Sequence, residues 1–523
     1  MAKLVLGPLL RYVDATSATV WVETDSSCEV AVNGRTARTF QAGDQHFALV
    51  RLEDLGPRTE YEVTLDDELV WPEPGSEFPK PVIRTTEVRR IAFGSCRAAP
   101  TQPLGPDALD AFAQRLMKTP EQEWPQAMIL LGDQVYADEP TEETKQWLKK
   151  RRDGTEEPDG EVVHFGEYAR LYHETWGDPE IRWLLSVVPT AMIFDDHDVR
   201  DDWNTSETWR KQMADKPWWK DRVRGAIASY WVYQHLGNLS PAELAKDPLY
   251  AKVKAQDTDV LPLLEEFAEA ADKEVDGRKS TWWSFRRDFG RARLLMVDTR
   301  CGRILDEGAR QMVSDDEFAW IERNTEHDDE YDHLLIGSSL PWLMPHALSH
   351  IQSINEIGAQ KPGWQGWAAE KIRQAVDLEH WPAFRASFDR LSRMIEKAGN
   401  NGAATVCVLS GDVHHSYVAE AEFARPTKAF VAQLVCSPIH NEAPKILRPG
   451  FRLSWSRPAS KVFRRLATFV GVPQDLVHWR KTSGPHFGNS VALLDFDGRR
   501  ARYRLISATG GETASVSLGR EPQ

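Results

Sequence analysis

The sequence predicts an α/β protein that begins with a small all-β unit, and two features of the chain lead to this prediction. Near the N-terminus the signals are short and β-like: residues 18–23 alternate in polarity, and Asn33-Gly34 marks a tight hairpin turn. Past Arg90, apolar strands alternate with longer helical segments, which is typical of a mostly parallel or mixed sheet covered by helices. We therefore expect two domains, residues 1–87 and residues 88–515.

One tyrosine refines the prediction for the first domain. Tyr61 follows a Leu-Gly-Pro turn and enters a strand, which resembles the corner of a fibronectin type III-like sandwich, where the tyrosine hydroxyl caps the loop behind it. Residues 82–86 are predicted to form the closing strand, before a linker around residues 87–90. The first domain is therefore expected to be a fibronectin type III- or Ig-like β-sandwich.

The second domain is predicted to begin with a β-α-β unit made of strand 91–93, helix 107–118 and strand 127–131. Polar residues follow both strands, at the carboxyl ends where ligands bind in open α/β sheets. The later elements predicted are an exposed insertion at 139–161, an acidic surface helix at 261–273, strands at 282–286, 294–300, 334–339 and 405–412, and a closing hairpin of 490–497 with 501–505.

The composition limits the classes of function. The 523 residues are 41% hydrophobic and 27% charged, and the net charge is −15. This acidic balance argues against a general nucleic-acid-binding surface. An anionic substrate must therefore be attracted locally, for example by bound cations.

The five cysteines are scattered without C-x-x-C spacing, so neither a disulfide framework nor a zinc ribbon is indicated. No apolar run reaches the roughly 18 residues that span a bilayer, and the N-terminus lacks a full signal-peptide core, so we expect a cytoplasmic protein; the oligomeric state stays open.

An acidic cluster follows one buried strand directly. The apolar run 192–194 stops at Asp195-Asp196-His197-Asp198. Carboxylates this close repel one another, and the repulsion is relieved by raised pKa values, by basic neighbours or by a bound metal ion. The cluster is therefore a candidate metal site.

Three other predicted strands end in the same way, with Cys96 after the first, Asp133 and Tyr136 after the second, and Asp412 and His414 after the last. We expect these strand ends to lie along one edge of the sheet, where groups distant in sequence meet. Two metal ions about 3.5–4 Å apart that share a carboxylate need about this many ligands.

The order of these motifs resembles the PhoD-like alkaline phosphatase/phosphodiesterase branch of the metallophosphoesterase superfamily. In that branch successive strands are followed by G-S-C, G-D-x-x-Y, D-D-H-D/E and S-G-D-x-H, and this sequence has all four in order. The resemblance extends over about residues 90–505, helped by Val297-Asp298-Thr299-Arg300. It implies an αββα metallophosphoesterase-type sandwich, and the family's usual β-sandwich fits the first domain.

The resemblance also implies two metal ions, Fe(III) and Ca(II), with other divalent ions as alternatives. Carried over residue by residue, it places Cys96, Asp133, Tyr136 and His414 on the iron, and Asp196 and Asp412 on the second ion, with Asp133 bridging. Thiolate and phenolate can neutralise a trivalent ion, whereas carboxylates suit calcium.

Several neighbouring residues have two interpretations each. Arg97 is a candidate for binding a phosphoryl oxygen, or it pairs with a local aspartate. The isolated histidine found between the third and fourth motifs of the superfamily corresponds to His346 or His350, and the spacing does not choose between them. We expect only one of His414 and His415 to be a ligand.

The predicted function is hydrolysis of phosphate mono- or diesters by a metal-bound hydroxide at a binuclear centre. His197 would protonate the departing alkoxide, with Asp198 or a backbone carbonyl fixing its tautomer. The alternatives are a non-catalytic, metal-stabilised binding protein, and a phosphodiesterase specific for phospholipids or nucleotides. The substrate is expected to be a small phosphoester; its identity and the preference for mono- or diesters stay open.

Overall fold

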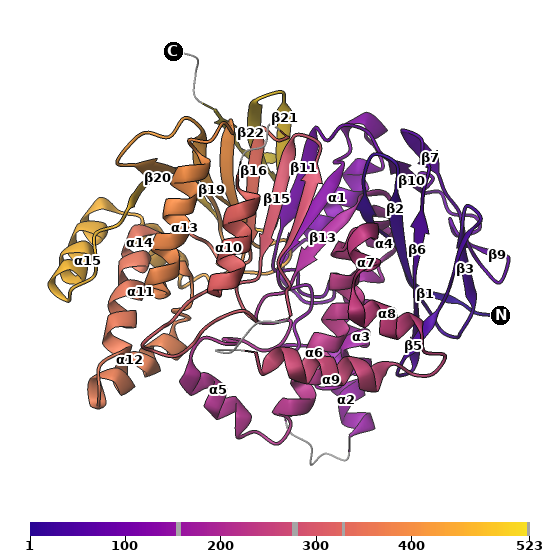
Figure 1. The fold of residues 1–523 in the computed structure, drawn as a ribbon, viewed down its shortest axis with the longest axis horizontal. Coiled ribbons are helices and arrows are strands. Elements are labelled where there is room, and N and C mark those ends of the chain that lie inside the picture. The colour runs from indigo at the N-terminus through magenta and orange to yellow at the C-terminus, as the bar shows by residue number, and fades with distance from the viewer. Residues whose placement is uncertain (153–157, 275–280, 327–329, 520–523) are drawn as a thin grey trace.

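The N-terminal β-rich region contains three small sheets (Figure 1). The computed structural model describes residues 1–152, 158–274, 281–326 and 330–519, so residues 153–157 of the predicted insertion lie outside the described chain. The sheet orders are β1-β2-β6-β5, β4-β3-β8-β9 and β10-β7. The strands are β1 Leu4–Val13, β2 Ala18–Thr24, β3 Glu29–Val32, β4 Arg35–Arg38, β5 Phe40–Ala42, β6 Gln45–Leu52, β7 Arg58–Glu60, β8 Val63–Leu65, β9 Glu68–Trp71 and β10 Val82–Arg84.

The predicted hairpin is confirmed. Asn33 and Gly34 connect β3 and β4, with φ angles of 46° and 78°. Two consecutive positive φ angles match the right-handed twist of a two-residue hairpin, and Asn-Gly is the pair that adopts them most easily.

The rest of the chain forms two larger sheets. The first has the order β13-β12-β11-β21-β22-β23, and the second β14-β15-β16-β17-β19-β18-β20. The strands of the first are β11 Arg90–Gly94, β12 Ala127–Leu131, β13 Thr190–Ile193, β21 Ser490–Asp497, β22 Arg500–Ser507 and β23 Glu512–Leu518. Those of the second are β14 Phe285–Phe289, β15 Ala292–Val297, β16 His333–Ser338, β17 Thr405–Ser410, β18 Ser416–Phe423, β19 Phe430–Val435 and β20 Val477–His486.

Helices surround these sheets (Figure 1). They are α1 Ala108–Leu116, α2 Glu142–Arg151, α3 Phe165–Trp176, α4 Pro179–Val187, α5 Glu207–Ala214, α6 Trp219–Tyr230, α7 Pro241–Leu244, α8 Pro248–Lys254, α9 Leu261–Asp272, α10 Asp315–Asn324, α11 His346–Ala359, α12 Trp364–Ala375, α13 Arg385–Ala398, α14 Arg448–Ser454 and α15 Arg457–Phe469. Among the described residues, no helix combines the length and the apolar character needed to cross a bilayer.

The two larger sheets share one hydrophobic core. Phe93 and Ile129 of the first sheet belong to the same buried cluster as Leu335 and Leu409 of the second. The mixed α/β architecture with a β-rich N-terminal region is therefore as the sequence predicted. The predicted domain boundaries stay a prediction, although β23 pairs with β22 and continues to Leu518, past residue 515.

The hydrogen bond predicted for the Tyr61 hydroxyl is wrong. The Tyr61 hydroxyl donates to the backbone oxygen of Ser186, 2.7 Å away in α4, and not to the loop behind it. Ser186 lies in the last turn of α4, where backbone carbonyls lack partners within the helix. The hydroxyl therefore serves the contact between the β-rich region and the rest of the protein.

Arg11 adds several buried hydrogen bonds between the N-terminal β-rich region and the rest of the protein. Its guanidinium is fully buried and donates to the backbone oxygens of Thr190, Tyr233 and Gln234 at 3.1, 2.7 and 2.7 Å. It also bonds Asn238, whose side chain in turn pairs with both backbone groups of Met192 on the edge strand β13. The N-terminal region therefore holds the strand that leads into the acidic cluster.

We predict that Arg11→Met destabilises the protein by about 3 kcal/mol, because several buried carbonyls lose a charged donor. Denaturant unfolding followed by tryptophan fluorescence would measure the change. Arg35→Met, at a side chain that is 54% exposed, is the control and should change stability by less than about 0.5 kcal/mol. Equal stability of the two variants would contradict the role of Arg11.

Candidate metal centre

The predicted strand ends come from two sheets and not from one. Parallel strands β11, β12 and β13 lead to Cys96, Asp133 and Asp195, whereas β17 of the second sheet leads to Asp412. The edges of the two sheets are in contact. The backbone nitrogen of Asp412 lies 3.3 Å from Ser95 Oγ, and Cys96 Sγ lies 3.7 Å from the backbone oxygen of Asp412. The expectation of a single sheet edge is therefore wrong, although the groups do converge.

Four of the predicted metal residues have left-handed backbone. Cys96, Asp133, Asp412 and His414 have φ angles of 56°, 49°, 64° and 49°. Such angles cost on the order of 1 kcal/mol for residues with a Cβ and persist where the surrounding structure imposes them, often at functional sites. The chain thus turns sharply just after β11, β12 and β17, where these four residues lie.

Carboxylates gather at this point in two groups that share Asp196, and all of them are buried except Asp412, which is partly exposed. Ligand atoms of Asp133, Asp195 and Asp196 lie within 4.8 Å of one another, and so do those of Asp196, Glu379 and Asp412. Burial, and then the charge of Asp195, raises the pKa of Asp133 well above its usual value. Asp133 Oδ1 is buried without a hydrogen-bond partner among the described residues. An unpartnered buried carboxylate oxygen fits a metal ligand.

The thiol and phenol predicted for the iron lie beside this group. Cys96 is fully buried, and Tyr136 Oη lies 3.4 Å from Asp133 Oδ2 and accepts from Asn441 Nδ2 at 2.9 Å. Burial and the charge of Asp133 raise the pKa of both groups well above their usual values. A cation is what would stabilise their anionic forms, so the donor set fits a metal of high charge.

Burial lowers the pKa of both His414 and His415, but their surroundings differ. Burial lowers the pKa of His414 to about 4, so its ring is neutral near pH 7, as metal binding requires. The His415 ring is buried among Tyr417, Phe451 and Phe487, and its Nδ1 contacts the backbone oxygen of Val413.

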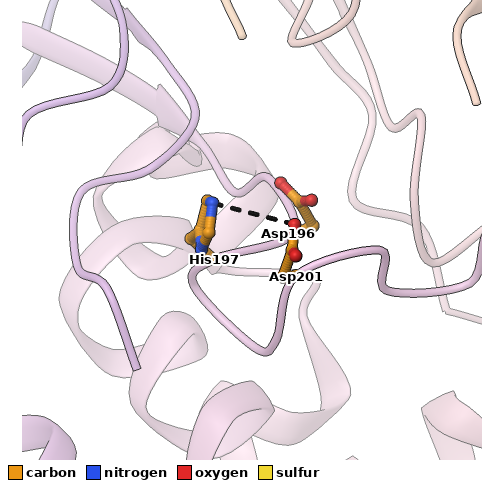
Figure 2. Close-up of side chains that lie close together, drawn as sticks. All are labelled: Asp196, His197 and Asp201. Carbon is orange, nitrogen blue, oxygen red and sulfur yellow. Dashed lines mark ion pairs between the residues drawn. The ribbon is translucent and has the colours of Figure 1, made fainter. Parts of the chain in front are cut away.

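The histidine of the acidic motif pairs with a residue that the sequence analysis missed. His197 Nδ1 lies 2.9 Å from Asp138 Oδ1. Burial opposes protonation, but Asp138 and then Asp196 raise the pKa of His197 well above its usual value, while the charge of His197 helps lower the pKa of Asp138 to about 2. An ionised carboxylate only accepts, so Nδ1 carries a proton. Figure 2 shows His197 beside Asp196 and Asp201. Nε2 of His197 lies 3.9 Å from Asp201 Oδ1.

The role predicted for Asp198 is therefore wrong. Asp198 Oδ2 accepts from the backbone N–H groups of Asp133 and Asp195 at 3.0 and 2.9 Å, and Oδ1 accepts from Gln234. Asp198 holds the two strand ends together, and Asp138 orients His197. The one sequence signal for Asp138 is its place two residues after Tyr136.

Arg97 pairs with a local aspartate, which is the second of the two interpretations predicted for it. Its guanidinium is 1% exposed, lies 2.7 Å from Asp107 Oδ2 and also donates to the backbone oxygen of Thr175. Because Asp107 caps α1, the pair anchors that helix. The guanidinium is committed to this pair, which contradicts its assignment to substrate.

His380, a histidine that the sequence analysis did not single out, contacts one of the predicted ligands. His380 Nε2 lies 2.7 Å from Asp412 Oδ2, and its Nδ1 lies 2.9 Å from Gln352 Nε2. His346 instead packs against Trp455 and Trp479. His380 and Glu379 lie between α12 and α13, outside any strand-end motif, so the sequence offered no signal for them.

Arg300 is another residue at the site that the predicted ligand set did not include. It follows β15, is fully buried, and its Nε lies 2.5 Å from Asp195 Oδ1. Its other nitrogens face Asp196 Oδ1 at 3.1 Å and the Glu379 carboxylate. One guanidinium thus balances three buried carboxylates.

We predict that Arg300→Met destabilises the protein by about 3–5 kcal/mol in the presence of a chelator, because buried charges lose their partner. Added divalent or trivalent metal should recover part of this loss, which denaturant unfolding with and without metal would measure. Arg303→Met, which leaves Arg300 on Glu379, is the control. If Arg300→Met lowers the free energy of unfolding equally with and without metal, the predicted link between Arg300 and the metal centre is wrong.

Comparison with known proteins places these features in a family. A family model described as "PhoD-like phosphatase" matches residues 110–449, and one described as "Domain of unknown function (DUF7800)" matches residues 1–83. None of the curated proteins compared with the chain matches it.

One of two solved structures compared with the chain shares its fold. A structure titled "Structure of PhoD" is similar with a TM-score of 0.58 and 13% identity, over 98% of this chain and 89% of that chain. The crystal structure of maltogenic amylase from S. marinus is 8% identical over 96% of this chain and 76% of that chain. Its TM-score of 0.16 is too low to indicate a shared fold. Because the phosphatase model covers more than half of the sequence, the chain belongs to the PhoD-like phosphatase family, which is metal-dependent, and is a phosphoric ester hydrolase.

Proposed function

We propose that this protein hydrolyses small phosphate monoesters, diesters or both at a binuclear metal centre. The observation that carries the proposal is the buried group of Asp133, Asp195 and Asp196, with its unpartnered carboxylate oxygen, beside the protonatable ring of His197. The proposal includes a metallophosphoesterase-type αββα sandwich for the two larger sheets and a fibronectin type III- or Ig-like β-sandwich for the N-terminal region.

The proposed ligands divide between two ions. Cys96, Asp133, Tyr136 and His414 would hold Fe(III), since thiolate and phenolate neutralise a trivalent ion. Asp196 and Asp412 would hold Ca(II), and Glu379 joins this set because its carboxylate lies with theirs. When bound, the metal ions would lower the pKa of a coordinated water and offset charge on the phosphoryl group.

His197 acts on the leaving group. Its Nδ1 proton is held by Asp138, which leaves Nε2 as the nitrogen that can donate to a departing alkoxide. Asp138 also accepts the backbone N–H of Asp201 at 2.7 Å, so the carboxylate is held from two sides. Asp138 is thus a positioning residue, and His197 is the catalytic acid.

A second candidate function from the sequence, a non-catalytic binding protein stabilised by metals, gains no support from this pairing. A stabilising metal site has no need for a histidine whose pKa is raised by a dedicated carboxylate. Phospholipid or nucleotide diesters stay alternatives within the same chemistry.

The assignment of Cys96 and Tyr136 predicts a coloured protein. Phenolate bound to ferric iron absorbs visible light, so Tyr136→Phe should abolish the band, and Cys96→Ser should lower iron content at least about tenfold while calcium is largely kept. Absorption spectra and elemental analysis measure both. A colourless iron-loaded wild type, or equal loss of both metals in Cys96→Ser, would count against the assignment.

The acid role predicts a dependence on the leaving group. His197→Ala should slow an alkyl phosphate ester by about 10²–10⁴-fold and a nitrophenyl ester much less, because a nitrophenolate leaves with little protonation. Asp138→Asn should show the same selectivity at about 10–100-fold. The measurement is kcat for both esters at equal metal content.

The control for this series is Asp201→Asn, which changes the more exposed carboxylate near Nε2 and should have the smallest effect. If His197→Ala slows both esters equally while the metals stay, His197 orders the site and is not the acid.

A further inference from the structure

A basic segment stands out on this acidic protein. Residues 445–472, which contain α14 and α15, carry seven basic residues and no Asp or Glu, while the whole chain has a net charge of −15. The basic residues are Lys445, Arg448, Arg452, Arg457, Lys461, Arg464 and Arg465. Figure 1 shows α15 at one end of the molecule, away from the N-terminal sheets.

The same helix exposes an apolar stripe. Val462, Leu466 and Phe469 are spaced by four and three residues, so they lie on one side of α15, and they are 54%, 46% and 87% exposed. Ala467, on another side, is buried, where α15 packs against α11. The apolar surface of α15 is thus wider than its contact with the protein requires.

The segment before α15 extends this surface. Leu447 and Leu453 are exposed there, and α14 contacts α15. We name the exposed residues of 445–472 the basic apolar patch. Exposed apolar side chains gathered on adjacent helices mark interaction surfaces.

The cations of α15 are available to a partner. In the described chain, no ion pair or hydrogen bond to a carboxylate involves the side chains of Arg457, Lys461, Arg464 or Arg465, whereas Arg448 pairs with Glu442 at 2.8 Å. Lys461 and Arg465 lie next to the stripe, one position before Val462 and Leu466. Unpaired cations beside an exposed apolar stripe are complementary to an anionic, apolar surface.

We propose that the basic apolar patch docks the protein onto a membrane surface containing anionic lipids, with the stripe entering the interface and the cations facing lipid phosphates. A second copy of this chain fits less well, because a two-fold contact would bring the same unpaired cations face to face. The proposal is independent of which ester the site hydrolyses.

A cavity lies beside the segment that carries the patch. Arg448, a partly buried residue of this segment, lines a cavity of about 370 Å³ together with Asn441, whose side chain bonds the Tyr136 hydroxyl. A lipid surface at the patch would therefore lie near this cavity.

The test is flotation of the full-length protein with vesicles. Wild type should float with vesicles of phosphatidylcholine and phosphatidylserine at low salt, and lose binding with phosphatidylcholine alone or in high salt, because each basic residue contributes through a screened charge. Leu466→Gln with Phe469→Gln, and separately Arg464→Glu with Arg465→Glu, should each weaken binding at least about tenfold.

Matched controls separate the patch from general effects. Lys149→Glu with Lys150→Glu changes two adjacent exposed lysines on α2, and Leu69→Gln changes an exposed leucine on β9; both should leave binding unchanged. Hydrolysis of a water-soluble ester by the patch variants should equal that of wild type, so a failure of docking is distinguishable from a failure of the proposed chemistry.

Two outcomes would overturn the proposal. One is absence of flotation with anionic vesicles at low salt, or loss of flotation that is equal in the control variants. The other is a concentration-dependent dimer in analytical ultracentrifugation that Phe469→Gln abolishes, which would assign the patch to a second copy of the chain.

Discussion

The buried carboxylates around Asp196 are the constraint on which the rest of the structure depends. Two like charges about 4 Å apart cost on the order of 4 kcal/mol at an effective dielectric constant near 20, so such a group exists only with compensation. The protein supplies part of it through Arg300 and His380. The unpartnered oxygen of Asp133 leaves the remainder to a cation.

The architecture delivers and holds these groups. Three parallel strands of one sheet and one of the other end at the same place, where Gly411 is needed because a Cβ there would lie 1.8 Å from Ser95 Oγ. The N-terminal region holds β13 through Arg11 and Asn238. This gives the β-rich region a physical role in the site although it contributes no candidate ligand.

The chemistry and the proposed docking surface use different parts of the chain. The metal centre lies at strand ends, where backbone geometry places each side chain, whereas the basic apolar patch lies on helices after β19. Residues 450–472 of that segment follow the part matched by the phosphatase family model, which ends at residue 449. Separate positions allow membrane association and hydrolysis to be altered independently.

The sequence by itself determined the strands, the Asn33-Gly34 hairpin and the order of the strand-end motifs. These features depend on local preferences and on residues adjacent in the chain, so the pattern is sufficient for strands such as β12, whose bounds were predicted to the residue. It also identified the family.

Tertiary structure alone decided the partners of individual side chains. Tyr61 bonds Ser186, Arg97 pairs with Asp107, His197 pairs with Asp138, and Asp412 pairs with His380. Most of these pairs join residues far apart in sequence, and a side chain with several polar neighbours takes the one that packing brings within about 3 Å. Which carboxylate meets which cation is therefore a property of how the two sheets and their loops pack, and no local pattern encodes it.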